Sequence, residues 1–189
     1  MPHPMQMAAA DTGLLVIDMQ EKLLARIPGA DALVAAVALL ADAARLLDMT
    51  VLATEQYPRG LGPTVAPLAG RLPERPDKMS FSCCGLPSVV DTLHREARPK
   101  VVLAGVEAHV CVLQTALDLL AHGFRVFVPA DAVASRFPLD HQHALGRLAQ
   151  AGAAVTTAEA CVFEWAGTAA HPRFKALSTL VLERARART

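Results

Sequence analysis

Two side chains capable of covalent chemistry, Asp18 and Cys111, each follow a short apolar run of the sequence. Asp18 comes directly after residues 13–17, and Cys111 comes shortly after residues 101–105 and opens an apolar helical segment. A thiol at a helix N-terminus feels the positive end of the helix dipole, which lowers its pKa towards the thiolate. A carboxylate beside such a thiol is a base–nucleophile pair, so the pattern indicates nucleophilic catalysis.

Each of these residues also has an ordinary structural role open to it. Asp18 could cap a helix or lie in a solvated turn, and Cys111 could be a small buried hydrophobe. Lys78 would stabilise a thiolate, but it ends a strand expected two places away from the strand before Asp18. That separation is about 10 Å at the usual strand spacing. Topology alone therefore does not bring Lys78 to the pair.

The remaining cysteines carry weaker signals. Cys83 and Cys84 are adjacent, which is poor geometry for a structural disulfide, and no nearby base accompanies them, so we interpret them as loop thiols. Cys161 lies in an apolar helical segment and is expected in the core. All four thiols are expected to be reduced, and the lack of a Cys-x-x-Cys motif makes a zinc ribbon unfavourable. No glycine-rich turn follows residues 13–17, which disfavours NAD binding.

The elements that must position Asp18 and Cys111 follow from the alternation of apolar runs with helical patterns. This alternation predicts a parallel sheet with helices on both faces. If the strand order is 3-2-1-4-5-6, the first and fourth strands are neighbours, and Asp18 and Cys111 lie at the same edge of the sheet. The stretch 58–76 is expected to be a long surface loop. Strands are expected at 13–17, 50–54, 76–80, 101–105, 126–129 and 153–156, and helices at 31–48, 87–97, 110–122, 140–151, 158–166 and 172–186.

Length and composition predict one soluble domain over residues 1–189. Hydrophobic residues make up 53% of the chain, and Lys+Arg and Asp+Glu both number 18. The missing basic excess argues against a nucleic-acid partner. The longest apolar run, 32–41, is too short to span a membrane, and the first basic residue, Lys22, leaves no charged region for a signal peptide. We therefore expect a cytoplasmic protein, without a membrane partner, that forms a homo-oligomer.

Three separated motifs resemble the signatures of the isochorismatase-like cysteine hydrolases. They are Ile17–Gln20, Lys78–Ser82 and Gly105–Ala116, and the stretch Thr54–Gly62 is most similar to the isochorismatase-domain-containing subgroup. The resemblance runs from about Thr12 to about Lys175. Each motif alone is weak, but the three at this spacing are specific.

The resemblance implies a catalytic triad of Asp18, Lys78 and Cys111 on a six-stranded three-layer α/β/α fold, and it supplies the placement of Lys78. It also implies a cis peptide bond between Val106 and Glu107. That bond would turn the backbone N–H groups of Glu107 and Cys111 into an oxyanion hole. The substrate-binding residues expected on this basis are Gln20, Gln56, Phe81, Val106 and Glu107.

Two departures from relatives narrow the expected function. Nicotinamidases of this superfamily carry histidine ligands for a metal after the second strand, but residues 54–59 contain no histidine, so we expect no metal and no other cofactor. Isochorismatases often lack the cysteine that is present here as Cys111. We therefore expect a cofactor-free hydrolase that cleaves C–N bonds of a small amide-type molecule through a thioester. The alternatives are vinyl-ether hydrolysis with Cys111 as a bystander, or a non-enzymatic interaction protein with a relic site.

Overall fold

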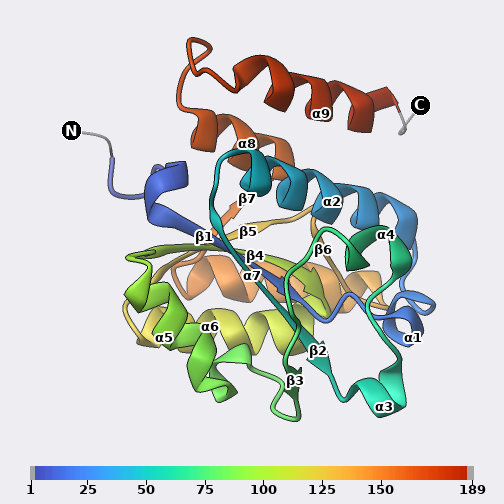
Figure 1. Cartoon of the computed structure of the whole chain (residues 1–189). Helices are drawn as coiled ribbons and strands as arrows, with labels where there is room; N and C mark the ends of the chain where they lie inside the picture. The colour runs from blue at the N-terminus through green and yellow to red at the C-terminus, as the bar shows by residue number, and fades with distance from the viewer. Residues whose placement is uncertain (1–2, 187–189) are drawn as a thin grey trace.

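The computed structural model describes residues 3–186, which form a parallel sheet between two layers of helices (Figure 1). The strands are β1 (Thr12–Ile17), β2 (Thr50–Gln56), β3 (Asp77–Lys78), β4 (Lys100–Val106), β5 (Arg125–Pro129), β6 (Val133–Ala134) and β7 (Ala154–Thr156). The α-helices are α1 (Glu21–Leu24), α2 (Ala30–Leu46), α3 (Pro58–Leu61), α4 (Ala66–Ala69), α5 (Pro87–Arg95), α6 (Leu113–Ala121), α7 (Pro138–Gln150), α8 (Ala158–Ala166) and α9 (Phe174–Arg186). Two 3₁₀ turns, η1 (Ala9–Asp11) and η2 (Cys83–Gly85), and one π-helical turn, η3 (Ala108–Val112), complete the list.

The strand order is β3-β2-β1-β4-β5-β7, and the paired strands are parallel. The predicted six-stranded order is confirmed, with β7 in the place of the sixth strand. The sequence missed β6, which pairs with β4 off this path, because its two residues are too short for an apolar run to mark. The stretch 58–76 is not entirely loop, since it contains the single-turn helices α3 and α4.

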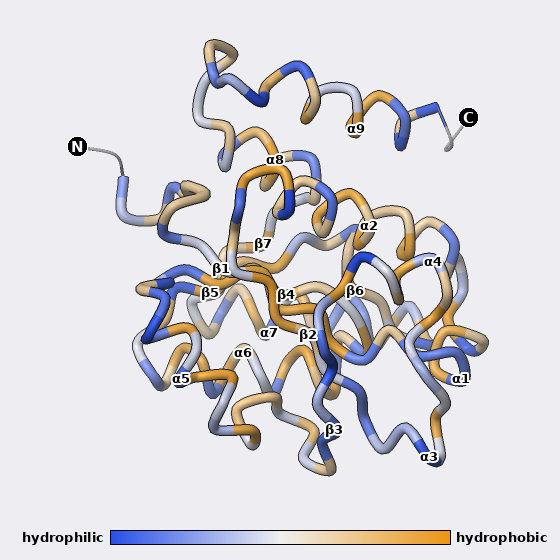
Figure 2. Tube along the Cα trace, in the orientation of Figure 1, coloured by the Kyte–Doolittle hydropathy of each residue, from blue (hydrophilic) through white to orange (hydrophobic). Residues whose placement is uncertain are grey.

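Successive side chains of the central strands point to opposite faces of the sheet and pack into two separate hydrophobic clusters. Leu14 and Val16 of β1 pack with α2, α8 and α9, while Leu15 and Ile17 pack with α5, α6 and α7 on the opposite face. This two-sided burial explains why the strands read as continuous apolar runs. The central strands β1 and β4 are drawn largely in orange, the hydrophobic end of the scale, in Figure 2. Within residues 3–186, no helix is both long and apolar enough to cross a membrane.

Gly105 allows β1 and β4 to approach closely at the edge where Asp18 emerges. It is the register partner of Ile17 and has φ of +120°, a conformation that side chains other than glycine rarely adopt. A Cβ added at Gly105 would lie 2.0 Å from the Ile17 carbonyl oxygen. The close pairing that places the ends of β1 and β4 side by side therefore depends on a residue without a side chain.

Gly105→Ala is expected to lower the free energy of unfolding by more than about 2 kcal/mol, because backbone strain adds to a clash with backbone. The matched control is Gly146→Ala in the middle of α7, where an added Cβ meets nothing within 4 Å. The control should stabilise the protein by about 0.5–1 kcal/mol through helix propensity. Urea denaturation measures both. Equal effects of the two substitutions would contradict the packing role of Gly105.

Candidate active site

The carboxyl ends of β1 and β4 place Asp18 and Cys111 at one edge of the sheet. Asp18 follows β1 directly, in a left-handed conformation with φ of 53°, and its N–H donates to the Thr54 carbonyl at 3.2 Å. Cys111 lies in η3, the π-helical turn that connects β4 to α6. Because Ile17 and Gly105 are register partners, both residues start from neighbouring strand ends. The structure therefore brings together the two residues that the strand order predicts to meet.

The Asp18 carboxylate is the centre of a buried polar cluster. Its Oδ2 accepts a hydrogen bond from Lys78 Nζ at 2.7 Å, and its Oδ1 accepts one from Thr54 Oγ1 at 2.8 Å. Both charged side chains of this ion pair are 0% exposed. The Cys111 thiol interacts with Asp18 closely enough that the charge of Asp18 raises the pKa of Cys111. One carboxylate thus contacts the cation and the thiol at the same time.

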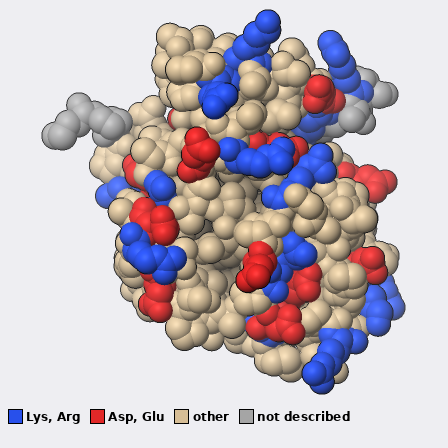
Figure 3. All heavy atoms as spheres, viewed as in Figure 1, with Lys and Arg blue, Asp and Glu red and all other residues tan. Residues whose placement is uncertain are grey.

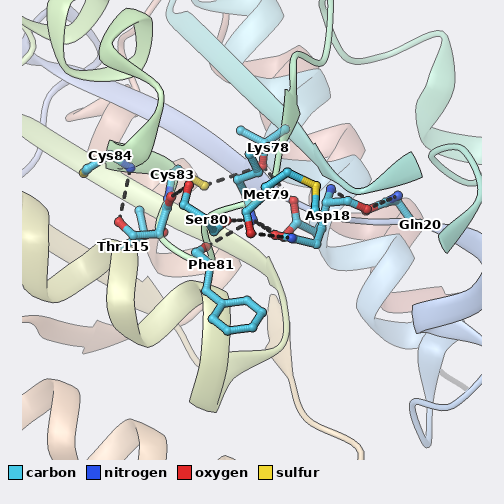
Figure 4. A network of polar contacts seen from close by, with 12 residues as sticks. Asp18, Gln20, Lys78, Met79, Ser80, Phe81, Cys83, Cys84 and Thr115 are labelled. Carbon is cyan, nitrogen blue, oxygen red and sulfur yellow. Dashed lines mark hydrogen bonds and ion pairs between the residues drawn. The ribbon is translucent and has the colours of Figure 1, made fainter. Parts of the chain in front are cut away.

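Lys78 reaches this cluster from β3, two strands away from β1 (Figure 4). Its Nζ also donates to Gln56 Oε1 at 2.7 Å and to the carbonyls of Ser80 and Phe81 at 3.3 and 3.1 Å. The strand spacing alone did not predict this contact, because it ignores the length of a lysine side chain. The four-carbon chain of Lys78 carries the ammonium past the end of β2 to the carboxylate.

Two glutamines expected to bind substrate are instead committed to the protein. The Gln20 amide, 0% exposed, donates to the carbonyls of Gln56 and Gly62 at 3.0 and 2.7 Å and accepts from the Gln56 N–H at 2.7 Å. The Gln56 side chain accepts from Lys78 and donates to the Met79 carbonyl at 3.0 Å. Both side chains therefore position the chain around Lys78.

Phe81 and Val106, both expected to bind substrate, differ in their exposure to solvent. The Phe81 ring is 53% exposed and points away from the polar cluster in Figure 4, so only its backbone carbonyl joins the cluster. Val106 is fully buried at the end of β4. Val106 and Glu107 are the expected substrate-binding residues that directly precede the turn containing Cys111.

The turn between β4 and Cys111 has an unusual backbone. The Val106–Glu107 peptide bond is cis. The Glu107 carbonyl accepts from the N–H groups of Val110 and Val112 at 3.0 and 3.2 Å, and the Cys111 N–H between them is not one of its donors. The π-helical turn therefore separates the Cys111 N–H from the carbonyl that an α-helix would offer it.

The side chain of Glu107 anchors this turn to the segment after β6. One carboxylate oxygen accepts from the backbone N–H and the Nε of Arg136, at 2.9 and 3.0 Å. Next to it, His109 Nδ1 and Ser135 Oγ lie 2.9 Å apart. Arg136 and Ser135 were not predicted from the sequence as neighbours of the site. The pairing of β6 with β4 would have indicated them, but a two-residue strand leaves no readable signal.

Burial and charge set the pKa values of the reacting groups. Burial raises the pKa of Asp18, and the Lys78 ammonium opposes that shift. Burial, followed by the charge of Asp18, raises the pKa of Cys111 to about 12, while Lys78 lowers it. The expectation that the helix N-terminus brings the pKa of Cys111 down towards the thiolate is therefore wrong. The thiol lies inside a buried turn beside a carboxylate, and both features raise its pKa.

The other thiols divide between the site and the core. Cys161 is 0% exposed in α8, which confirms its predicted place in the core. The interpretation of Cys83 as a loop thiol without partners is wrong, because it is 0% exposed in η2 and its Sγ lies 3.5 Å from Thr54 Oγ1. Thr54 was also missed, although it pairs with Ile17 and so lies beside Asp18. The β1–β2 register could have revealed Thr54, whereas nothing local in the sequence reveals the fold of the Cys83 segment.

The strand order, the two helical layers and the polar cluster at the carboxyl edge define a three-layer α/β/α protein with a candidate active site at one edge of its parallel sheet. The isochorismatase domain family matches residues 12–160, and this chain belongs to the isochorismatase family of hydrolases. Isochorismatase domain-containing protein 2 of Homo sapiens is 41% identical over 175 residues, 90% of this chain and 82% of that protein.

Solved structures agree with this assignment. The structure of MAR1 ribonuclease from Caenorhabditis elegans is 42% identical, with a TM-score of 0.89 over 94% of this chain and 92% of that one. The YcaC gene product from Escherichia coli, described as an octameric hydrolase of unknown specificity, has a TM-score of 0.88 over 99% of this chain and 96% of its own. At 24% identity, that second likeness shows the fold alone.

The high pKa of Cys111 predicts how its alkylation depends on pH. Far below the pKa the thiolate fraction rises about tenfold per pH unit, so the iodoacetamide rate at Cys111 should climb steadily through about pH 7 to 9. Lys78→Ala should slow the reaction because an attractive charge is lost, and Asp18→Asn should speed it because the repulsion is removed. Peptide mass spectrometry resolves Cys111 from the other thiols. A plateau near pH 8, or identical rates in all three proteins, would contradict this charge balance.

Proposed function

We propose that this protein is a cofactor-free cysteine hydrolase that cleaves the C–N bond of a small amide-type molecule through a thioester on Cys111. The observation that supports it best is the position of Asp18, which holds Lys78 Nζ at 2.7 Å and the Cys111 thiol on the same carboxylate. A base, a cation and a nucleophile thus share one buried centre. These are the parts that acyl transfer by a thiol requires.

The first step of the proposed reaction starts from a protonated thiol, because the pKa of Cys111 is about 12. Asp18 accepts the thiol proton while the sulfur attacks the substrate carbonyl carbon, so no stable thiolate has to accumulate. Lys78 attracts the negative charge that develops on the sulfur. The same ammonium opposes the effect of burial on the pKa of Asp18, which keeps the carboxylate available as a base.

The carbonyl oxygen of the substrate becomes negatively charged in this step and needs donors. The N–H groups of Glu107, which precedes the π-helical turn, and of Cys111, which lies within it, are proposed to supply them. Each such donor is typically worth about 3–4 kcal/mol in the transition state. Collapse of the tetrahedral intermediate expels the amine, which takes the proton from Asp18. Water then attacks the thioester, giving its proton to Asp18, and the acid product leaves as Cys111 regains a proton.

Two features bear on the substrate. Basic and acidic side chains are interspersed on the face shown in Figure 3, and the net charge of the chain is zero, which favours a small molecule over an extended polyanion. The C. elegans relative is named a ribonuclease. A test panel should therefore contain RNA as well as amides, carbamates, hydroxamates, ureides and a vinyl ether.

Cys111→Ala is expected to reduce hydrolysis of the best amide-type substrate by at least about 10³-fold, because the proposed acyl intermediate forms on the Cys111 sulfur. The matched control is Cys161→Ala, which removes an equally buried thiol on the other side of the sheet and should leave turnover unchanged. The measurement is steady-state kinetics with each purified protein.

Other outcomes of the same assay would overturn the proposal. Amide hydrolysis that survives in Cys111→Ala would exclude the thioester. Turnover of the vinyl ether that survives that substitution, with no amide turnover in the unsubstituted protein, would favour acid–base cleavage with Cys111 as a bystander. A protein that turns over no member of the panel and whose Cys111 stays inert to iodoacetamide would favour the interaction protein.

A further inference from the structure

A second thiol, that of Cys83, lies in the site and has no part in the proposed hydrolysis. It is fully buried at the start of η2, and its backbone N–H donates to Thr115 Oγ1 at 2.9 Å. Figure 4 shows Cys83 on the same side of the cluster as Thr115, with its sulfur directed towards the polar network around Asp18. A buried thiol this close to a catalytic carboxylate calls for a chemical explanation.

The hydrogen bonds of Thr54 define the direction in which the Cys83 proton points. A threonine hydroxyl has one proton to donate, and Thr54 donates it to Asp18 Oδ1 at 2.8 Å. In the contact of 3.5 Å between Thr54 Oγ1 and Cys83 Sγ, the thiol must therefore be the donor. A continuous path thus leads from the Cys83 proton through Thr54 to the carboxylate of Asp18.

Cys111 interacts with the same carboxylate, and the charge of Asp18 raises the pKa of Cys111. A charge on Cys83 would raise the pKa of Cys111 further, so the two thiols also interact with each other. Thr115, which holds the backbone of Cys83, is four residues beyond Cys111, one helical turn along the same face. Both sulfurs belong to one hydrophobic cluster. Two thiols therefore flank one base in a water-poor environment.

We propose that Cys83 is the resolving thiol of Cys111, so that a peroxide converts the pair into a reversible Cys83–Cys111 disulfide. This proposal rests on the assignment of Cys111 as the reactive thiol of the site. The disulfide would remove the nucleophile while it lasts, and it would protect Cys111 from oxidation beyond the sulfenic acid, which thiol reductants do not reverse.

The chemistry needs only a peroxide and the groups already described. Asp18 takes the Cys111 proton as the sulfur attacks one peroxide oxygen; the O–O bond breaks, and the leaving oxygen takes up the proton as water or an alcohol. Cys111 is oxidised to the sulfenic acid and the peroxide is reduced. Cys83 then attacks the sulfenic sulfur, its proton moves through Thr54 to Asp18, and the S–O bond breaks. The hydroxyl leaves with that proton as water, and the S–S bond remains.

Peroxide treatment of the whole protein, followed by mass spectrometry without reductant, tests this directly. The expected result is a loss of two hydrogen atoms, a peptide pair cross-linked between Cys83 and Cys111, and full recovery of both free thiols with dithiothreitol. Cys83→Ser should lose the cross-link and accumulate sulfinic acid at Cys111 that dithiothreitol does not reverse. Cys84→Ser, which removes the adjacent half-buried thiol, should behave like the unsubstituted protein.

Three results would overturn the resolving role. The first is formation of sulfinic acid at Cys111 that is as fast in the unsubstituted protein as in Cys83→Ser. The second is a disulfide formed through Cys84 instead of Cys83. The third is a Cys111 thiol that peroxide leaves unchanged. Cys83→Ala, checked by circular dichroism, separates the loss of the thiol from a folding defect. Because the readout is mass, it is independent of turnover. If the Cys83–Cys111 disulfide forms but the protein hydrolyses no substrate, the proposed function is wrong and the resolving role of Cys83 is still supported.

Discussion

The buried ion pair between Lys78 and Asp18 is the interaction on which the site depends. Both side chains are withdrawn completely from water, which is expensive unless each charge finds further partners. Asp18 is satisfied by Thr54 in addition to Lys78, and the ammonium by the Gln56 amide and two backbone carbonyls. The two buried charges thus have partners within the protein, and Cys111 is the group proposed to react with a substrate.

This pair explains why much of the surrounding polar structure exists. Gln20 fastens the segment after β2 by three hydrogen bonds, which keeps Gln56 in place to hold the ammonium. Burial of the Cys111 thiol, followed by the charge of Asp18, raises the pKa of Cys111 to about 12, and Lys78 opposes this shift. In the proposed reactions the thiol therefore starts protonated, and Asp18 takes its proton as the sulfur attacks a substrate or a peroxide.

The sequence predicted the parts of the site that depend on strand order and missed the parts that depend on side-chain reach. Asp18 and Cys111 each follow a recognisable strand, so their proximity came from topology alone. Lys78 was placed only by the family resemblance, because strand spacing takes no account of a long side chain. Cys83 was misjudged because the segment between β3 and α5 folds back onto the sheet without a local signal. The pKa of Cys111 was misjudged in direction because burial is a property of the tertiary structure.

The measurement that most directly tests the dependence on Lys78 and Asp18 is a double-mutant cycle in urea denaturation at neutral pH, with Asp18→Asn, Lys78→Met and the two combined. Each single substitution leaves one buried charge unpaired and should cost about 3–5 kcal/mol of unfolding free energy. The combined variant removes both charges and should be more stable than the sum of the single effects by at least about 2 kcal/mol. Effects that add to within about 0.5 kcal/mol would show that the two charges do not depend on each other, and the central role given to this ion pair would be wrong.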